Sequence, residues 1–213
     1  DSTYFIEVTF PDTPILRDVV GGRDSNCIHR DFKTYQNYCY GVADEGQSSL
    51  QIFDMSYLPD SVHLVYDSDS LTRLSHNIFI DNGEAFLATN WHKSWGRIPM
   101  TILDLHEKPE DPKSVSHLGA LVVEDELLFT HVHDVFVRDE IAYCSNGSGG
   151  VCVYDLKDIT NGLQLLGQLT TYPDQGYNHA SWLTDDSKYL AMADETHGMR
   201  LKMVDVSDLT DMK

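Results

Sequence analysis

A short strand-like pattern recurs five times along this chain, and its spacing limits the folds that the chain can adopt. Each copy is an alternating run that ends in an acid, and the acids are Glu7, Asp54, Asp104, Asp155 and Asp205. The steps between them are 47, 50, 51 and 50 residues. A period of 20–50 residues is typical of solenoids and propellers, in which each repeat is one small structural unit. The runs occupy residues 4–8, 50–55, 100–105, 151–156 and 201–206.

A second element recurs four times and predicts a hairpin in each unit. It begins at Arg30, His76, His133 and His179, and an aromatic residue always stands ten positions further on. A short β-rich run and then a polar turn lie between the two, as in Asp-Asn-Gly at 81–83. A run, a turn and a second run indicate a β-hairpin.

The two elements together predict four strands per unit, here named A, B, C and D in chain order. Strand A follows the His or Arg position, strand B surrounds the aromatic residue, and strand C ends in the acid. The D strands are predicted at 15–20, 62–66, 115–123 and 163–170. Four short strands with polar turns in each repeat are the signature of a propeller blade. We therefore expect an all-β fold, a β-propeller of four-stranded antiparallel blades.

The predicted ring does not close. Residues 1–22 supply only strands C and D, and residues 179–213 supply only A, B and C. Because both ends carry strand C, they cannot complete one blade together. We expect a single partial propeller over 1–213 with about four to five blades present, three of them full, and further chain beyond it. The blade parts are 1–22, 27–73, 74–130, 131–177 and 178–213.

Charge and hydropathy exclude some partners. The net charge is −19, from 34 acidic and 15 basic residues. Phosphate binding needs a basic patch, so we expect no nucleic-acid partner. No apolar run approaches the ~18 residues of a membrane helix, so no transmembrane segment is expected in this chain. The acidity favours solubility, and calcium binding is the alternative, although no DxDxDG loop is present.

Four cysteines stand at 27, 39, 144 and 152, and their spacings match no zinc motif. We expect buried free thiols and no disulfide. Cys144 and Cys152 flank one predicted hairpin, and the pattern places them one residue out of register. Disulfide geometry is demanding for strand neighbours offset in this way.

Several segments resemble the "choice-of-anchor B" family with LVIVD-type propeller repeats. The matching segments are Arg-Asp-Phe-Lys-Thr-Tyr-Gln-Asn at 30–37, Ser-His-Asn-Ile-Phe-Ile at 75–80, Val-His-Asp-Val at 132–135, Gly-Tyr-Asn-His-Ala-Ser-Trp-Leu-Thr-Asp-Asp at 176–186 and Val-Asp-Val-Ser-Asp at 204–208. The resemblance implies a longer bacterial propeller that is exported and held at the outer cell surface by a C-terminal anchor. It implies no reaction and supplies no catalytic residues.

Antiparallel meanders place the start of strand A and the end of strand B on the same face, near the central channel. We expect the four aligned positions Arg30, His76, His133 and His179 to converge there around the propeller axis. Alternation then predicts that His131 points the same way as His133. The other candidates at this channel mouth are Asp31, Asn77, Asp134, Asp44, Glu45, Asn90, Asn146, Asp194 and Glu195. Asp134 is expected to point away from His133.

Imidazoles and carboxylates together are ligands for zinc, manganese or iron. If the hub binds a divalent metal such as zinc or calcium, we expect His76, His133 and His179 to ligate it. The added carboxylates would come from Asp44, Asp194 or Glu195. Alternatively the histidines cap exposed backbone at the hub. Arg30 argues against a symmetric ring of ligands because a guanidinium only donates hydrogen bonds.

The connection between strands B and C is longer in the second blade than elsewhere. It carries Trp91, His92, Trp95 and Arg97, a set that suits stacking on sugars or gripping a protein partner. Alternatively the tryptophans fold back and seal the hub.

These features lead to three functional hypotheses. The first is an exported or cell-surface scaffold that mediates protein or glycan interaction without catalysis. The second is a metal-dependent hydrolase, lactonase-like, with a His/carboxylate site at the hub. The third is a structural subunit of an envelope complex. No GxSxG elbow, Walker loop or GxGxxG motif is present.

Overall fold

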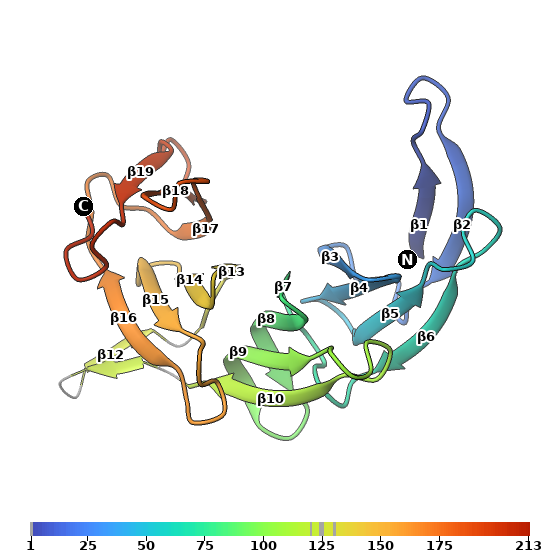
Figure 1. The fold of residues 1–213 in the computed structure, drawn as a ribbon, viewed down its shortest axis with the longest axis horizontal. Helices are drawn as coiled ribbons and strands as arrows, with labels where there is room; N and C mark the ends of the chain where they lie inside the picture. The colour runs from blue at the N-terminus through green and yellow to red at the C-terminus, as the bar shows by residue number, and fades with distance from the viewer. Residues whose placement is uncertain (1, 120, 124–125, 130) are drawn as a thin grey trace.

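The computed structural model describes residues 2–119, 121–123, 126–129 and 131–213. All regular elements within these ranges are β-strands, which form an open arc of antiparallel sheets (Figure 1). Three sheets have four strands, one has three, and two have two. The predicted fold class, an all-β partial propeller of four-stranded antiparallel blades, is confirmed.

Each four-stranded blade is a meander in chain order. The first comprises β3–β6, with bounds Arg30–Tyr35, Tyr38–Ala43, Leu50–Asp54 and His63–Ser68. The second comprises β7–β10, with bounds Asn77–Asp81, Glu84–His92, Gly96–Asp104 and Lys113–Leu118. The third comprises β13–β16, with bounds Asp134–Arg138, Ile141–Ser145, Val151–Asp155 and Gln164–Leu169.

The sheets at the two ends of the arc are incomplete. At one end β1 (Ser2–Glu7) pairs only with β2 (Ile15–Gly21), which correspond to strands C and D. At the other end the sheet contains only the equivalents of strands A, B and C. Those three strands are β17 (Asn178–Leu183), β18 (Tyr189–Asp194) and β19 (Lys202–Asp205).

Two local predictions for the second blade are wrong. The D strand predicted over 115–123 ends at Leu118, because Gly119 follows and a glycine gives a strand no side chain to pack. β11 (Leu121–Val123) instead pairs with β12 (Glu126–Phe129) in a separate hairpin. The long B–C connection is mostly strand, since β8 runs to His92 and β9 starts at Gly96. Residues 120, 124–125 and 130 of the blade part 74–130 lie outside the described ranges.

The core lies between neighbouring blades rather than within any one of them. In β8, Phe86 and Ala88 pack in a cluster shared with the third blade. Ala85 and Leu87 alternate with them and pack in a cluster shared with the first blade. A middle strand is therefore buried on both faces, and this explains why it lacks the polar alternation of a sheet with one solvated face.

The innermost strands form the hub of the arc. β7 contacts β3 on one side and β13 on the other, and β13 also contacts β17. Each strand begins at or next to one of the aligned Arg or His positions. The blade repeat thus brings residues about fifty positions apart in the chain to one place.

All four cysteines are free and buried. The predicted offset between Cys144 and Cys152 is wrong, because the register of β14 and β15 places them directly opposite each other. The turn at 146–150 holds an odd number of residues, which keeps the two positions paired. Burial raises the pKa of Cys152 to about 12 and that of Cys144 well above its usual value, so both thiols stay protonated at neutral pH.

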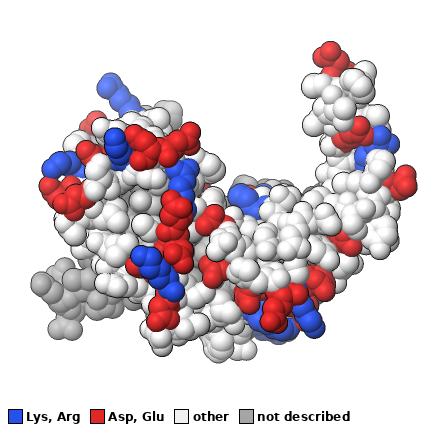
Figure 2. Space-filling model, viewed as in Figure 1, with Lys and Arg blue, Asp and Glu red and all other residues white. Residues whose placement is uncertain are grey.

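Figure 2 shows acidic side chains spread over the visible face, with basic side chains scattered singly or beside them. This distribution agrees with the net charge of −19 and shows no broad basic patch on that face. The described elements include no helix with the length and apolarity that a membrane span requires.

Replacing Gly167 in β16 by alanine should destabilise the fold, because a Cβ there would lie 1.9 Å from the backbone oxygen of Leu209. Backbone cannot yield as a flexible side chain can, so we expect a loss of about 1–3 kcal/mol. Urea denaturation measures it. The matched control is Gly21→Ala in β2, where no atom lies within 4 Å of the added Cβ. Equal midpoints for the two variants would contradict the packing described.

Candidate metal centre

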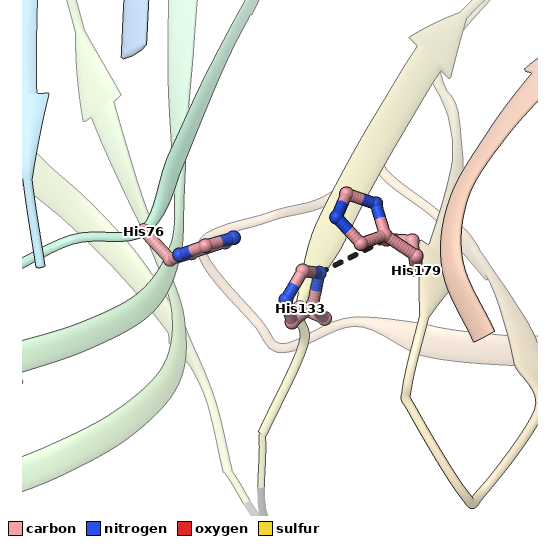
Figure 3. Close-up of side chains that lie close together, drawn as sticks. All are labelled: His76, His133 and His179. Atoms are coloured by element: carbon pink, nitrogen blue, oxygen red, sulfur yellow. Dashed lines mark hydrogen bonds between the residues drawn. The ribbon is translucent and has the colours of Figure 1, made fainter. Parts of the chain in front are cut away.

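Three histidines from three successive blades meet at the hub (Figure 3). His76 and His133 immediately precede β7 and β13, and His179 is the second residue of β17. The ring centroids lie 4.2 Å apart for His76 and His133, and 4.5 Å apart for His133 and His179. One nitrogen from each ring lies within 4.8 Å of the other two. We call these three residues the hub triad.

Two members of the hub triad are held through Nδ1. His76 Nδ1 lies 2.6 Å from Asp44 Oδ2, and His133 Nδ1 lies 3.0 Å from the backbone oxygen of His179. A carbonyl only accepts a hydrogen bond, and so does an ionised carboxylate, so each Nδ1 is the donor. In the neutral rings the lone pair is therefore on Nε2. A fixed tautomer supported by a carboxylate or carbonyl is typical of metal-ligating histidines.

Burial makes the centre of the triad neutral at physiological pH. The pKa of His133 is lowered to about 4, chiefly by burial and also by neighbouring His76, although the bond to the His179 oxygen opposes this. A neutral imidazole is the form that binds a metal, so no proton has to leave His133 at pH 7.

Glu195 and Asp44 each place a carboxylate near the hub triad. Glu195 follows β18, and its Oε2 lies 3.8 Å from His179 Nε2 and 4.0 Å from His133 Nε2. Its side chain is 60% exposed and can swing toward either ring. Asp194, the third candidate carboxylate, is instead engaged by Lys202 Nζ at 2.8 Å and by the hydroxyl of Tyr172.

Arg30 occupies the fourth aligned position but does not join the triad. Its guanidinium donates to Gln51 of its own blade and lies over the ring of Phe32. The expectation that all four aligned side chains converge is therefore wrong for Arg30. The sequence repeat predicts where each strand begins. It does not predict the direction of a long side chain, which depends on the hydrogen-bond partners that the side chain can reach.

Asp31 and Asn77, two other predicted channel residues, bond to each other across neighbouring blades. Asp31 Oδ2 accepts hydrogen bonds from Asn77 Nδ2 and from the backbone N–H of Ile78, both at 3.0 Å. This carboxylate therefore ties β3 of the first blade to β7 of the second. Burial raises the pKa of Asp134, the residue after His133, to about 6.

His131 and His133 share one neighbour, Tyr177, which the sequence patterns do not single out as a site residue. The hydroxyl of Tyr177 lies 2.8 Å from His131 Nε2, and its ring meets that of His133 edge-on. Space for the tyrosine depends on Gly147, which has a φ of +59° and whose added Cβ would lie 2.4 Å from the ring. The Gly-Tyr-Asn-His segment before the last blade is the signal that could have identified it.

The tryptophan-bearing segment forms the exposed tip of the β8–β9 hairpin. The ring of Trp95 is stacked on His92 at 4.2 Å and meets His117 edge-on, and Trp95 is 64% exposed. It borders a cavity of about 510 Å³ together with Arg97. Trp91 is also exposed, at 42%, so neither tryptophan seals the hub.

The chain matches no family model and no curated protein sequence. Solved structures resemble it in fold. A Bacteroides fragilis protein assigned as a 6-phosphogluconolactonase aligns with a TM-score of 0.65 at 12% identity, over 99% of this chain and 63% of that one. The periplasmic gluconolactonase of Pseudomonas aeruginosa aligns with a TM-score of 0.63 at 13% identity, over 92% and 59%.

The computationally designed Ika4 protein also aligns, with a TM-score of 0.56 at 12% identity over 86% of this chain and 92% of that one. The chain spans less than two thirds of the length of the Bacteroides fragilis protein and of the Pseudomonas aeruginosa protein. At such identities the likeness shows the fold alone, and any chemistry has to be argued from the hub.

Removing the Asp31 carboxylate should loosen the contact between the first two blades. Asp31→Ala leaves the Ile78 N–H and the Asn77 amide without their acceptor, which should cost about 1–3 kcal/mol. Chemical denaturation measures the loss. Asp12→Ala, at an exposed position without a described side-chain partner, is the control. A loss no larger than that of the control would show that Asp31 does not join the blades.

Proposed function

We propose that this chain is a propeller module that binds a divalent transition-metal ion, best matched by zinc, at the hub triad. The observation that carries the proposal is that the three imidazoles come from three separate blades and are within reach of one ion. Three histidines around zinc leave a fourth position open, as in catalytic rather than structural zinc sites.

The surroundings of the triad support this proposal. Ligand nitrogens of tetrahedral zinc are about 3.4 Å apart for bonds of about 2.0–2.1 Å, so modest side-chain rotations would complete the site. The Nδ1 contacts of His76 and His133 leave Nε2 available on both rings. The carboxylate of Glu195 is near enough to supply a further ligand or to accept a proton.

Zinc binding is tested with protein stripped by a chelator and then exchanged into chelator-free buffer. We expect His133→Ala and His179→Ala each to abolish one zinc per chain in calorimetric titration. His63→Ala, which removes a histidine from the outer strand β6, should leave binding unchanged. Zinc affinity that is equal in His133→Ala and in the parent protein would overturn the proposal.

The second candidate function is hydrolysis of a cyclic ester at this centre. Glu195 supports it, because a carboxylate close to the metal ligands can take a proton from the attacking water. The water oxygen bonds to the carbonyl carbon, the ring C–O bond breaks, and the leaving oxygen takes a proton to give a hydroxy acid. Two proteins of similar fold are named as lactonases, so lactones are the cyclic esters to test first.

Arg97 favours an anionic substrate for that reaction. It lies near enough to His131 to lower the pKa of that residue, although burial is the larger cause. His131 bonds Tyr177, whose ring meets His133, so a guanidinium within electrostatic range of His131 would attract a carboxylate or phosphate on a substrate at the hub. The protein or glycan partner and the exported location expected from the sequence stay predictions.

Lactone hydrolysis is tested by following acid release from gluconolactone and from its 6-phospho form with zinc-loaded protein. We expect Glu195→Gln to lower kcat by about 10²–10⁴-fold while zinc content stays constant. Arg97→Gln should raise KM for the phosphorylated substrate more than for the neutral one. Release at the uncatalysed rate by the zinc-loaded parent protein would exclude this candidate without affecting the zinc proposal.

A further inference from the structure

A second group of ligand-type side chains lies beside the hub triad. It consists of His29, Asp44 and Glu45, which each offer one ligand atom within 4.8 Å of the others. The register of β3 with β4 explains the grouping. Arg30 pairs with Ala43, so His29 and Asp44 are the next residues beyond that pair at the hub end of the two strands.

Asp44 is a member of the second group and also contacts the hub triad. Its Oδ2 lies 2.6 Å from His76 Nδ1, whereas its Oδ1 is buried and has no hydrogen-bond partner among the described residues. A buried carboxylate oxygen without a donor carries an uncompensated desolvation cost. A cation bound to Oδ1 would remove that cost while Oδ2 continues to orient His76.

Glu45 is fixed in a position to ligate. Its Oε2 accepts hydrogen bonds from the backbone N–H groups of Ile28 and His29, at 2.9 and 3.2 Å. Its Oε1 lies 3.0 Å from His29 Nδ1. The backbone therefore holds one oxygen, and the other is directed at the imidazole.

Charge also favours a cation here. Within the described ranges, neither Asp44 nor Glu45 is paired with a lysine or an arginine. The equivalent pair in the last blade differs, because Asp194 is neutralised by Lys202. The group at the first blade is thus specific to that blade and cannot be explained as a structural feature that every repeat shares.

We infer that the hub holds a second divalent cation, bound by His29, Asp44 and Glu45 beside the triad, with Asp44 also hydrogen-bonded to His76. Two carboxylates and one imidazole suit manganese, iron or zinc. This inference extends the zinc proposal, and the following experiment separates the two.

The number of ions per chain distinguishes them. Stripped protein is saturated with zinc alone, freed of excess by gel filtration and analysed for metal content. We expect two zinc ions in the parent protein, one in His29→Ala and one in His179→Ala. Glu45→Gln should also retain one ion, since it removes the charge but keeps the side-chain shape. His63→Ala should retain two.

His29 is 67% exposed on its side chain, so its replacement should leave the fold intact, which circular dichroism checks. One ion in the parent protein that survives His29→Ala but not His179→Ala would overturn the second site and leave the triad proposal standing. Two ions in His29→Ala would also overturn it. No ion at all would overturn both proposals.

Discussion

Packing between blades is the interaction on which the rest of this structure depends. The middle strands bury both of their faces, so Phe86 and Leu87, adjacent in β8, stabilise contacts with different neighbouring blades. Each buried apolar cluster found among the described residues is shared between neighbouring sheets. This packing also determines the geometry of the hub, because the neighbouring blades fix the position of each inner strand.

The hub triad follows from that arrangement. Its members are 57 and 46 residues apart in the chain, yet the rings of adjacent members lie within 4.5 Å centroid to centroid. The contacts that surround them also cross between blades, since Asp44 of the first blade supports His76 of the second. The His179 backbone of the last blade likewise supports His133 of the third. Neighbouring blades are thus joined by hydrogen bonds at the hub as well as by apolar packing between the sheets.

The sequence was informative wherever one local rule repeats. The fifty-residue period predicted the blades, and the aligned His positions predicted which side chains meet. It was less informative where a side chain selects among partners, as with Arg30, which bonds Gln51 instead of facing the triad. It also misplaced features that depend on one residue of register, such as the pairing of Cys144 with Cys152. The repeat placed Asp44 and Glu45 at the channel mouth, but their grouping with His29 depends on the register of β3 with β4.

Dependence on three blades has a mechanical consequence. An ion that binds the assembled hub but not the separated blades stabilises the assembled form by mass action, in proportion to the logarithm of its concentration over its dissociation constant. A metal ion bound by ligands from consecutive repeats would therefore cross-link neighbouring blades. The free energy needed to separate the blades would then increase with the concentration of the metal ion in the surroundings.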